Sequence, residues 1–130
     1  MAFATWPPQF ATGKVFALVG ANMPPPPEGA AKPDPPPQWG DVGVVRQRLG
    51  DRVRDLGHDT GTMRWPVLSP QHYRVAMEQT SGPIRSLEKL MAAEPSKLAA
   101  FRAELDAIAA QYFTDNAVRM DYLLTRATRK

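Results

Sequence analysis

Residues 1–8 read MAFATWPP, a strand-like segment that runs directly into two prolines. Aromatic and β-branched side chains alternate loosely over residues 2–6, which predicts a β-strand. Pro7 and Pro8 end this strand, because a proline has no backbone N–H to donate to a neighbouring strand. The segment has the character of a strand from the middle of a sheet, so we expect a complete domain to contain a further part that precedes it.

Two other segments are predicted to be strands. Residues 53–68 (VRDLGHDTGTMRWPVL) alternate in the manner of a half-buried strand. Residues 117–128 (AVRMDYLLTRAT) alternate as well, and Leu123 makes the second face of this segment partly apolar. Because a strand with two apolar faces is covered on both sides, we expect the last strand to be an inner strand of the sheet.

Helices are predicted between these strands from capping residues and apolar spacing. The first covers residues 11–23 with Thr12 as N-cap, and the second covers residues 42–49 with Asp41 as N-cap and Gly50 after the last turn. A third begins at Pro70 with Ser69 as N-cap, and a fourth begins at Pro83. The last covers residues 96–113. Asp115-Asn116 is predicted to be a turn. Strands separated by helices predict one α/β domain over residues 1–130.

The proline-rich segment, residues 24–38, has two possible roles. Eight of the fourteen residues 24–37 are proline, which predicts extended polyproline II structure. The segment could be a ligand for an SH3-type groove or a stiff surface loop. We favour the loop, because no Arg or Lys has a suitable spacing from a PxxP pair and because Trp39 is expected to anchor the segment on the fold.

Composition restricts the cellular setting and the partners. Cysteine is absent, which excludes disulfides and thiolate metal sites and fits a reducing cytoplasm. The net charge is +3, and the only dense basic stretch, residues 126–130, is expected to be a solvated end rather than a nucleic-acid surface. No apolar run approaches the ~20 residues that a membrane span needs, so no membrane partner is expected.

The usual catalytic motifs are missing from the sequence. It contains no GxGxxG, Walker A or GxSxG pattern, and a hydrolase triad has no support beyond the presence of His58 and His72. The two histidines have no metal-ligand spacing, so no metal site is predicted. Five large side chains could line an apolar pocket, although such residues are more often core: Trp6, Trp39, Trp65, Tyr73 and Met77.

A series of short motifs gives a resemblance that covers nearly the whole chain. In order they are Ala2–Trp6 followed by Pro7-Pro8, Trp39-Gly40-Asp41 before a helix that ends in Leu49-Gly50, Ser69-Pro70, Gly82-Pro83 and the final strand Tyr122–Arg129. In this order they resemble the C-terminal half of a class I S-adenosylmethionine-dependent methyltransferase. The similar group is the bacterial branch related to the ubiquinone and menaquinone biosynthesis methyltransferases.

The resemblance implies a partial Rossmann-like methyltransferase domain. Its three-strand mixed sheet would have the last strand antiparallel between the other two, packed with four to five helices. The family binds its cofactor in the preceding half, through a glycine-rich turn and an acidic residue at the end of the second strand. Residues 1–130 contain neither feature. S-Adenosylmethionine is therefore the cofactor expected of intact relatives, and this chain alone is expected neither to bind it nor to methylate.

The resemblance also implies a substrate-side role. The acceptor would be a small apolar molecule, and the residues expected to wall its pocket are Trp6, His72, Tyr73, Met77 and Gly82. The exposed edge of the Ala2–Trp6 strand is expected to pair with an N-terminal methyltransferase half or with a second copy of the chain. The alternative is a non-enzymatic interaction module that uses the sheet edge or the proline-rich segment.

Overall fold

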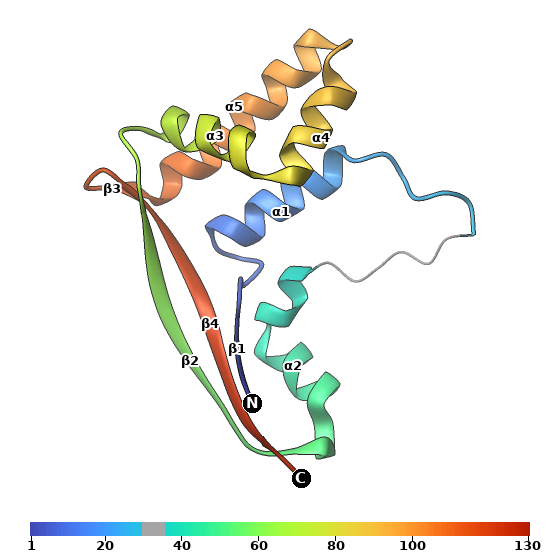
Figure 1. The fold of residues 1–130 in the computed structure, drawn as a ribbon, viewed down its shortest axis with the longest axis vertical. Helices are drawn as coiled ribbons and strands as arrows, with labels where there is room; N and C mark the ends of the chain where they lie inside the picture. The colour runs from blue at the N-terminus through green and yellow to red at the C-terminus, as the bar shows by residue number, and fades with distance from the viewer. Residues whose placement is uncertain (30–35) are drawn as a thin grey trace.

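Four strands and five α-helices make up the described residues, 1–29 and 36–130, of the computed structural model (Figure 1). The strands are β1 (Ala2–Thr5), β2 (Val53–Pro66), β3 (Phe113–Thr114) and β4 (Ala117–Arg129). The α-helices are α1 (Ala11–Asn22), α2 (Val42–Leu49), α3 (Pro70–Thr80), α4 (Gly82–Met91) and α5 (Pro95–Tyr112). Two short 3-10 helices, η1 (Pro36–Gly40) and η2 (Gly50–Arg52), flank α2. The predicted α/β class is confirmed.

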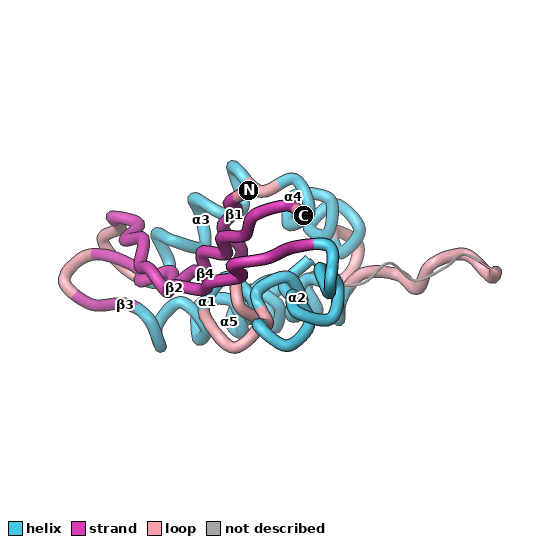
Figure 2. The backbone as a smooth tube through the Cα atoms, turned by 90° about the horizontal axis from the view of Figure 1, so that it is seen from below, coloured by secondary structure: helices cyan, strands magenta, loops and turns pink. Residues whose placement is uncertain are grey.

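β4 lies at the centre of the sheet, between β1 and β2, and is antiparallel to both (Figures 1 and 2). Ala2–Thr5 pair with Leu123–Arg126, and β2 pairs with β4 along almost its whole length. The expected position of the last strand is therefore confirmed. The expected mixed sheet is wrong: β1 and β2 run in the same direction, but β4 separates them, so every pair among the described strands is antiparallel.

The sheet also has a fourth strand that the sequence did not predict. The two residues of β3 pair with the start of β4, Phe113 with Val118 and Thr114 with Ala117. Asp115 and Asn116 form the two-residue turn between β3 and β4, with positive φ angles of 48° and 52° respectively. The apolar spacing of α5 continues to Phe113, which is why the sequence places this residue at the end of the helix.

Both faces of β4 are buried, at opposite ends of the strand. Val118 and Met120 point to one face, where Tyr73 of α3 and Ala109 of α5 cover them. Leu123 and Thr125 lie on the other face and are buried too. On that side Phe3, the partner of Thr125, packs edge-on against Trp39 of η1 with ring centroids 5.9 Å apart. By the alternation of residues along β4, α3 and α5 therefore cover one face at one end of the strand, and η1 covers the other face at the other end.

A second core lies among the helices. Val15, Leu18 and Val19 of α1 pack against apolar residues of α4 and α5, namely Ile84, Leu87, Met91, Phe101 and Leu105. Met77 of α3 is half-buried and contacts both this cluster and the one on the sheet. Met77 thus links the core among the helices to the core on the sheet.

The turn after β1 is held between two glycines. A Cβ on Gly13 would lie 2.2 Å from the Pro7 carbonyl oxygen, and a Cβ on Gly40 would lie 2.4 Å from the Pro7 Cα atom. Both distances are shorter than any real Cβ contact. The close approach of α1 and η1 to the buried Pro7 therefore requires glycine at both positions.

Most predicted helix signals are confirmed. The Asp41 carboxylate accepts a hydrogen bond from the Val44 N–H at 2.9 Å, and the Ser69 hydroxyl accepts one from the His72 N–H at 3.0 Å. Gly50 adopts a positive φ of 49°. The N-cap predicted at Thr12 is wrong: α1 follows Phe10, and the Thr12 hydroxyl is buried without a partner. The helix begins early because the proline turn leads straight into it, with the Phe10 N–H donating to the Pro7 carbonyl.

The proline-rich segment is only partly extended. Residues 24–29 form neither helix nor strand, and residues 30–35 lie outside the described residues. Residues 36–40 form η1, so the polyproline II structure predicted through residue 37 is wrong at its end. Trp39 anchors this end as expected, since its carbonyl accepts a hydrogen bond from the Thr5 hydroxyl at 2.8 Å. Contact with β1 therefore overrides the local preference of the prolines.

Two alanine substitutions on α1 test the close approach of Pro7. We expect Gly13→Ala to lower the free energy of unfolding by about 1–3 kcal/mol, because its methyl group cannot fit beside Pro7. Gly20→Ala on the same helix meets no atom within 4 Å and should raise that free energy by about 0.5–1 kcal/mol, the helix preference of alanine. Urea denaturation measures both. Equal effects of the two substitutions would contradict a tight Pro7 contact.

Candidate functional site

The residues expected to wall an acceptor pocket are centred on α3 and its N-terminal turn. Tyr73 is 1% exposed, and its ring packs edge-on against Trp65 of β2 with centroids 5.4 Å apart. Met77, one helical turn later, packs against the same cluster. Ser69 at the N-cap and Pro70 at the first helical position fix the start of α3, and this start directs Tyr73 onto the sheet.

Trp6 reaches this cluster from the end of β1. Its ring lies edge-on to Tyr122 of β4 with centroids 6.4 Å apart. The Tyr122 ring in turn lies over Gly61 of β2, where a Cβ would come within 2.3 Å of the ring. The absence of a side chain at Gly61 therefore makes room for the aromatic contact between β1 and β4.

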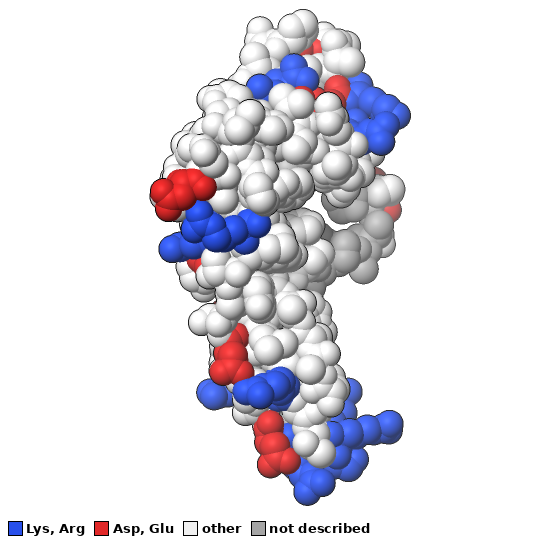
Figure 3. Space-filling view, turned by 60° about the vertical axis from the view of Figure 1, so that its left-hand side comes forward, with Lys and Arg blue, Asp and Glu red and all other residues white. Residues whose placement is uncertain are grey.

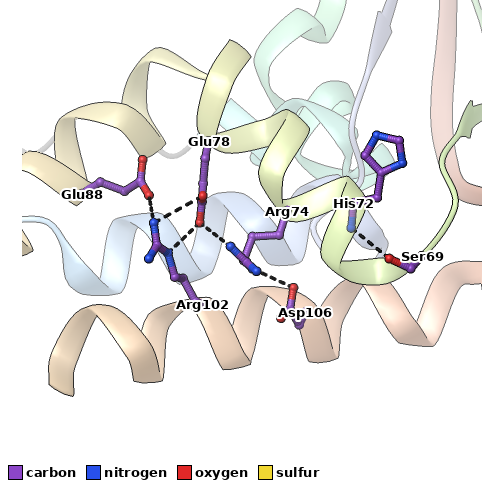
Figure 4. A network of polar contacts seen from close by, with 7 residues as sticks. All are labelled: Ser69, His72, Arg74, Glu78, Glu88, Arg102 and Asp106. Carbon is purple, nitrogen blue, oxygen red and sulfur yellow. Dashed lines mark hydrogen bonds and ion pairs between the residues drawn. The ribbon is translucent and has the colours of Figure 1, made fainter. Parts of the chain in front are cut away.

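The other two residues lie apart from that cluster. His72 is exposed, and its Nδ1 accepts a hydrogen bond from the Leu68 N–H at 3.1 Å. Figure 4 shows its ring directed away from the charged side chains of α3. Gly82 is exposed at the start of α4 with no atom within 4 Å of its Cβ position. The structure thus brings Trp6, Tyr73 and Met77 together and leaves His72 and Gly82 at the surface.

Three surface cavities are lined by residues other than the five candidates. One lies between α1 and η1, a second between η1 and α2, and a third between α1 and α4. The five candidate residues are in none of these three walls. Their role in binding an acceptor stays a prediction, and Tyr73 is also a well-packed core residue.

A charged network on α3 and α5 is the largest polar cluster next to these residues (Figure 4). Glu78 accepts hydrogen bonds from Arg74 at 2.9 Å and from Arg102 at 2.8 Å. Arg74 also donates to Asp106 at 2.9 Å, and Arg102 donates to Glu88 of α4 at 2.7 Å. The sequence shows the spacing of four between Arg74 and Glu78, but the partners on α4 and α5 depend on how the helices pack.

The electrostatics of this network favour the charged forms. Burial alone raises the pKa of Glu78, but the hydrogen bonds from Arg74 and Arg102 outweigh it and hold the pKa below its ordinary value of 4.5. Burial likewise opposes the charge on Arg74, and the hydrogen bonds to Glu78 and Asp106 still leave its pKa raised. Of the four arginine–carboxylate pairs, the three that cross between helices clamp α3, α4 and α5 together, which suits a structural role.

Tyr73 carries a buried hydroxyl that has no hydrogen-bond partner. Burial raises the pKa of Tyr73 to about 12, because the charged phenolate would lose its hydration. His58 shows a similar orphan atom: its Nδ1 lies 3.2 Å from the Thr125 hydroxyl, while its Nε2 is buried without a partner. Tyr73, on α3, packs against Trp65 where β2 pairs with Val118, whereas His58 lies further back along β2 where it pairs with Thr125, so the two atoms do not form one site.

No protein-family model and no curated protein sequence matches the chain. In the part of the chain that the structure describes, no three His, Asp or Glu side chains are placed to hold a metal ion. Each helix of the described residues is too short or too polar to cross a bilayer.

Glu78→Gln tests the charged network. At pH 7 we expect it to lower the free energy of unfolding by about 1–3 kcal/mol, because two arginines lose a charged acceptor. The lowered pKa of Glu78 means that its stabilisation is present above pH 4.5 and is lost as the pH falls through the folded-state value. The difference between wild type and variant should therefore shrink in acid, as followed by urea denaturation at several pH values.

Glu94→Gln is the matched control for that experiment. Glu94 is exposed and its carboxylate lies 3.6 Å from the Lys97 amine, a surface pair worth less than about 1 kcal/mol. If Glu78→Gln is no more destabilising than Glu94→Gln at pH 7, the network does not clamp the helices.

Tyr73→Phe tests the orphan hydroxyl. Removing a buried hydroxyl that has no partner relieves its desolvation cost, so the variant should be as stable as wild type or more stable by about 1 kcal/mol. Thermal denaturation at pH 7 measures the change. A loss of more than about 1 kcal/mol would mean that the hydroxyl has a partner in solution.

Proposed function

We propose that this chain is the substrate-side portion of an S-adenosylmethionine-dependent methyltransferase that acts on a small apolar acceptor. The observation that carries the proposal is the position of β4, antiparallel between β1 and β2. This is the strand order that the resemblance to the methyltransferases implies. If strands simply paired in the order in which they occur in the sequence, β2 and not β4 would lie beside β1. The α/β fold is observed, and the methyltransferase family and its chemistry are what we propose.

The outer edge of β1 supports a missing neighbour. Met1 and Ala127 exchange both of their backbone hydrogen bonds, at 2.6 and 3.0 Å. In an antiparallel pair such residues alternate with residues whose N–H and C=O groups point away, so those of Ala2 and Ala4 point away from β4. Both residues are exposed, and among the described residues nothing bonds to these outward groups. A further strand can therefore pair there.

A cofactor-binding portion would be the natural partner for that edge. Residues 1–130 lack the glycine-rich turn that holds the cofactor in the family, so S-adenosylmethionine binding is assigned to the partner. Methyl transfer depends mainly on holding acceptor and methyl group in line, which needs walls rather than acids and bases. Trp6, Tyr73 and Met77 are the side chains we propose nearest to the acceptor, with His72 and Gly82 at its margin.

The open edge of β1 equally favours a second candidate function. A chain of this kind could serve as an interaction module that receives a strand from another protein through Ala2 and Ala4. The two functions differ in what the partner brings: an S-adenosylmethionine site in the first case and any exposed strand in the second.

Binding and assembly measurements test the proposal. Calorimetry of the isolated chain with S-adenosylmethionine should show no binding, and light scattering after size-exclusion chromatography should show self-association at high micromolar concentration. Ala4→Pro should abolish self-association, because it removes an outward N–H but no hydrogen bond to β4. Ala4→Ser keeps the N–H and should associate as wild type does.

The outcomes separate the two functions. Micromolar binding of S-adenosylmethionine to the isolated chain, or a wild-type monomer at high concentration, would overturn the missing-neighbour proposal. The reading frame directly upstream of the coding sequence decides between the candidates: a glycine-rich methyltransferase half there supports the first, and an unrelated region with its own promoter supports the second.

A further inference from the structure

An apolar cavity of about 710 Å³ lies between α1, the turn after β1 and the start of η1. The elements around it can be followed in Figure 1. Its wall includes Phe16, Ala17 and Gly20 on α1, and prolines supply five of the twelve described residues that line it. Cavities that bind small molecules in proteins have volumes of about 300–1,000 Å³, so this one has room for an organic ligand.

The chemistry of the wall is almost wholly apolar. Among the lining residues that the structure describes, none carries a charge, and Gln38 is the only one with a polar side chain. The side-chain Oε1 atom of Gln38 already accepts a hydrogen bond from Arg48 at 2.7 Å. Water molecules in this cavity therefore find few partners, and an apolar ligand gains by displacing them. A charged ligand would lose its hydration without compensation.

Prolines and a helix restrict the backbone of much of the described wall. Proline rings have fixed backbone angles, and α1 is a regular helix, so little order must be gained when a ligand binds. The ring of Phe16 is 39% exposed and available for contact. Gly20 presents bare backbone to the cavity, with nothing within 4 Å of its Cβ position.

The two glycines on α1 differ in what they accommodate. Gly13 is required by Pro7, whereas none of the described residues 1–29 and 36–130 occupies the space at Gly20. A glycine inside a helix is less favourable than an alanine, and packing among the described residues offers no compensation at Gly20. An external molecule that contacts the helix backbone closely would make use of this space.

We propose that this cavity is a binding site for a small, uncharged molecule with flat apolar rings. Prolyl rings, the Phe16 ring and the bare helix backbone at Gly20 are surfaces against which a planar ring system packs well. The site is formed by this chain alone, so it depends neither on a cofactor-binding partner nor on the methyltransferase proposal.

Fluorescence titration with Nile red, an uncharged planar dye, tests the site. We expect enhanced emission with saturable micromolar binding, displacement by 2-naphthol and no displacement by the charged 2-naphthalenesulfonate. Gly20→Phe fills the cavity and should weaken dye binding by about tenfold or more, a loss of about 1.4 kcal/mol. Ala100→Phe adds the same ring at an exposed position of α5 and should leave binding unchanged.

Further variants keep the test decisive. Phe16→Ala removes a wall of the cavity without disturbing the buried core and should also weaken binding, which covers the case that Gly20→Phe fails to fold. Ala4→Pro should bind the dye as wild type does, so a failure of the β1-edge proposal is seen separately. Absence of saturable dye binding by wild type, or equal binding by wild type and the folded cavity variants, would overturn the proposed site.

Discussion

The pairing of β4 with β1 and β2 is the interaction on which the rest of the structure depends. It joins the two ends of the sequence, since Ala2–Thr5 pair with Leu123–Arg126. It also creates two buried faces, one for the helices α3 and α5 and one for η1. Without this inner strand, the apolar stripes of the helices would have no common surface to cover, and β1 would be an isolated segment of four residues.

Close backbone approach is the second constraint, and it connects the fold to the functional proposals. Pro7 lies between Gly13 and Gly40, which places the turn after β1 directly against α1 and η1. The same arrangement forms the apolar cavity beside α1 and brings Trp39 onto Phe3. Small residues at a few positions thus decide how the proline-rich part of the chain meets the sheet.

Residue types and spacing predicted only part of the candidate site. Trp6, Tyr73 and Met77 do come together, because strand and helix periodicity place them on inward faces. His72 is directed outward, since the Ser69 cap fixes the first turn of α3 and the next residue, Tyr73, takes the inward position. The ion pairs of Glu78 with Arg102 and of Arg74 with Asp106 cross between helices, and no local pattern shows such contacts.

The sequence by itself determined β1, β2 and β4, the helices and most of their caps, because alternation, the spacing of apolar residues and groups such as Asp41 and Ser69 act over a few neighbouring positions. It also indicated that the last strand is buried on both faces. Only the tertiary structure decided that the described strands all pair antiparallel, that residues 36–40 form a 3-10 helix and that Gly20 lines a cavity. Each of these features depends on which distant segment lies alongside, and that is set by packing of the whole chain rather than by local preference.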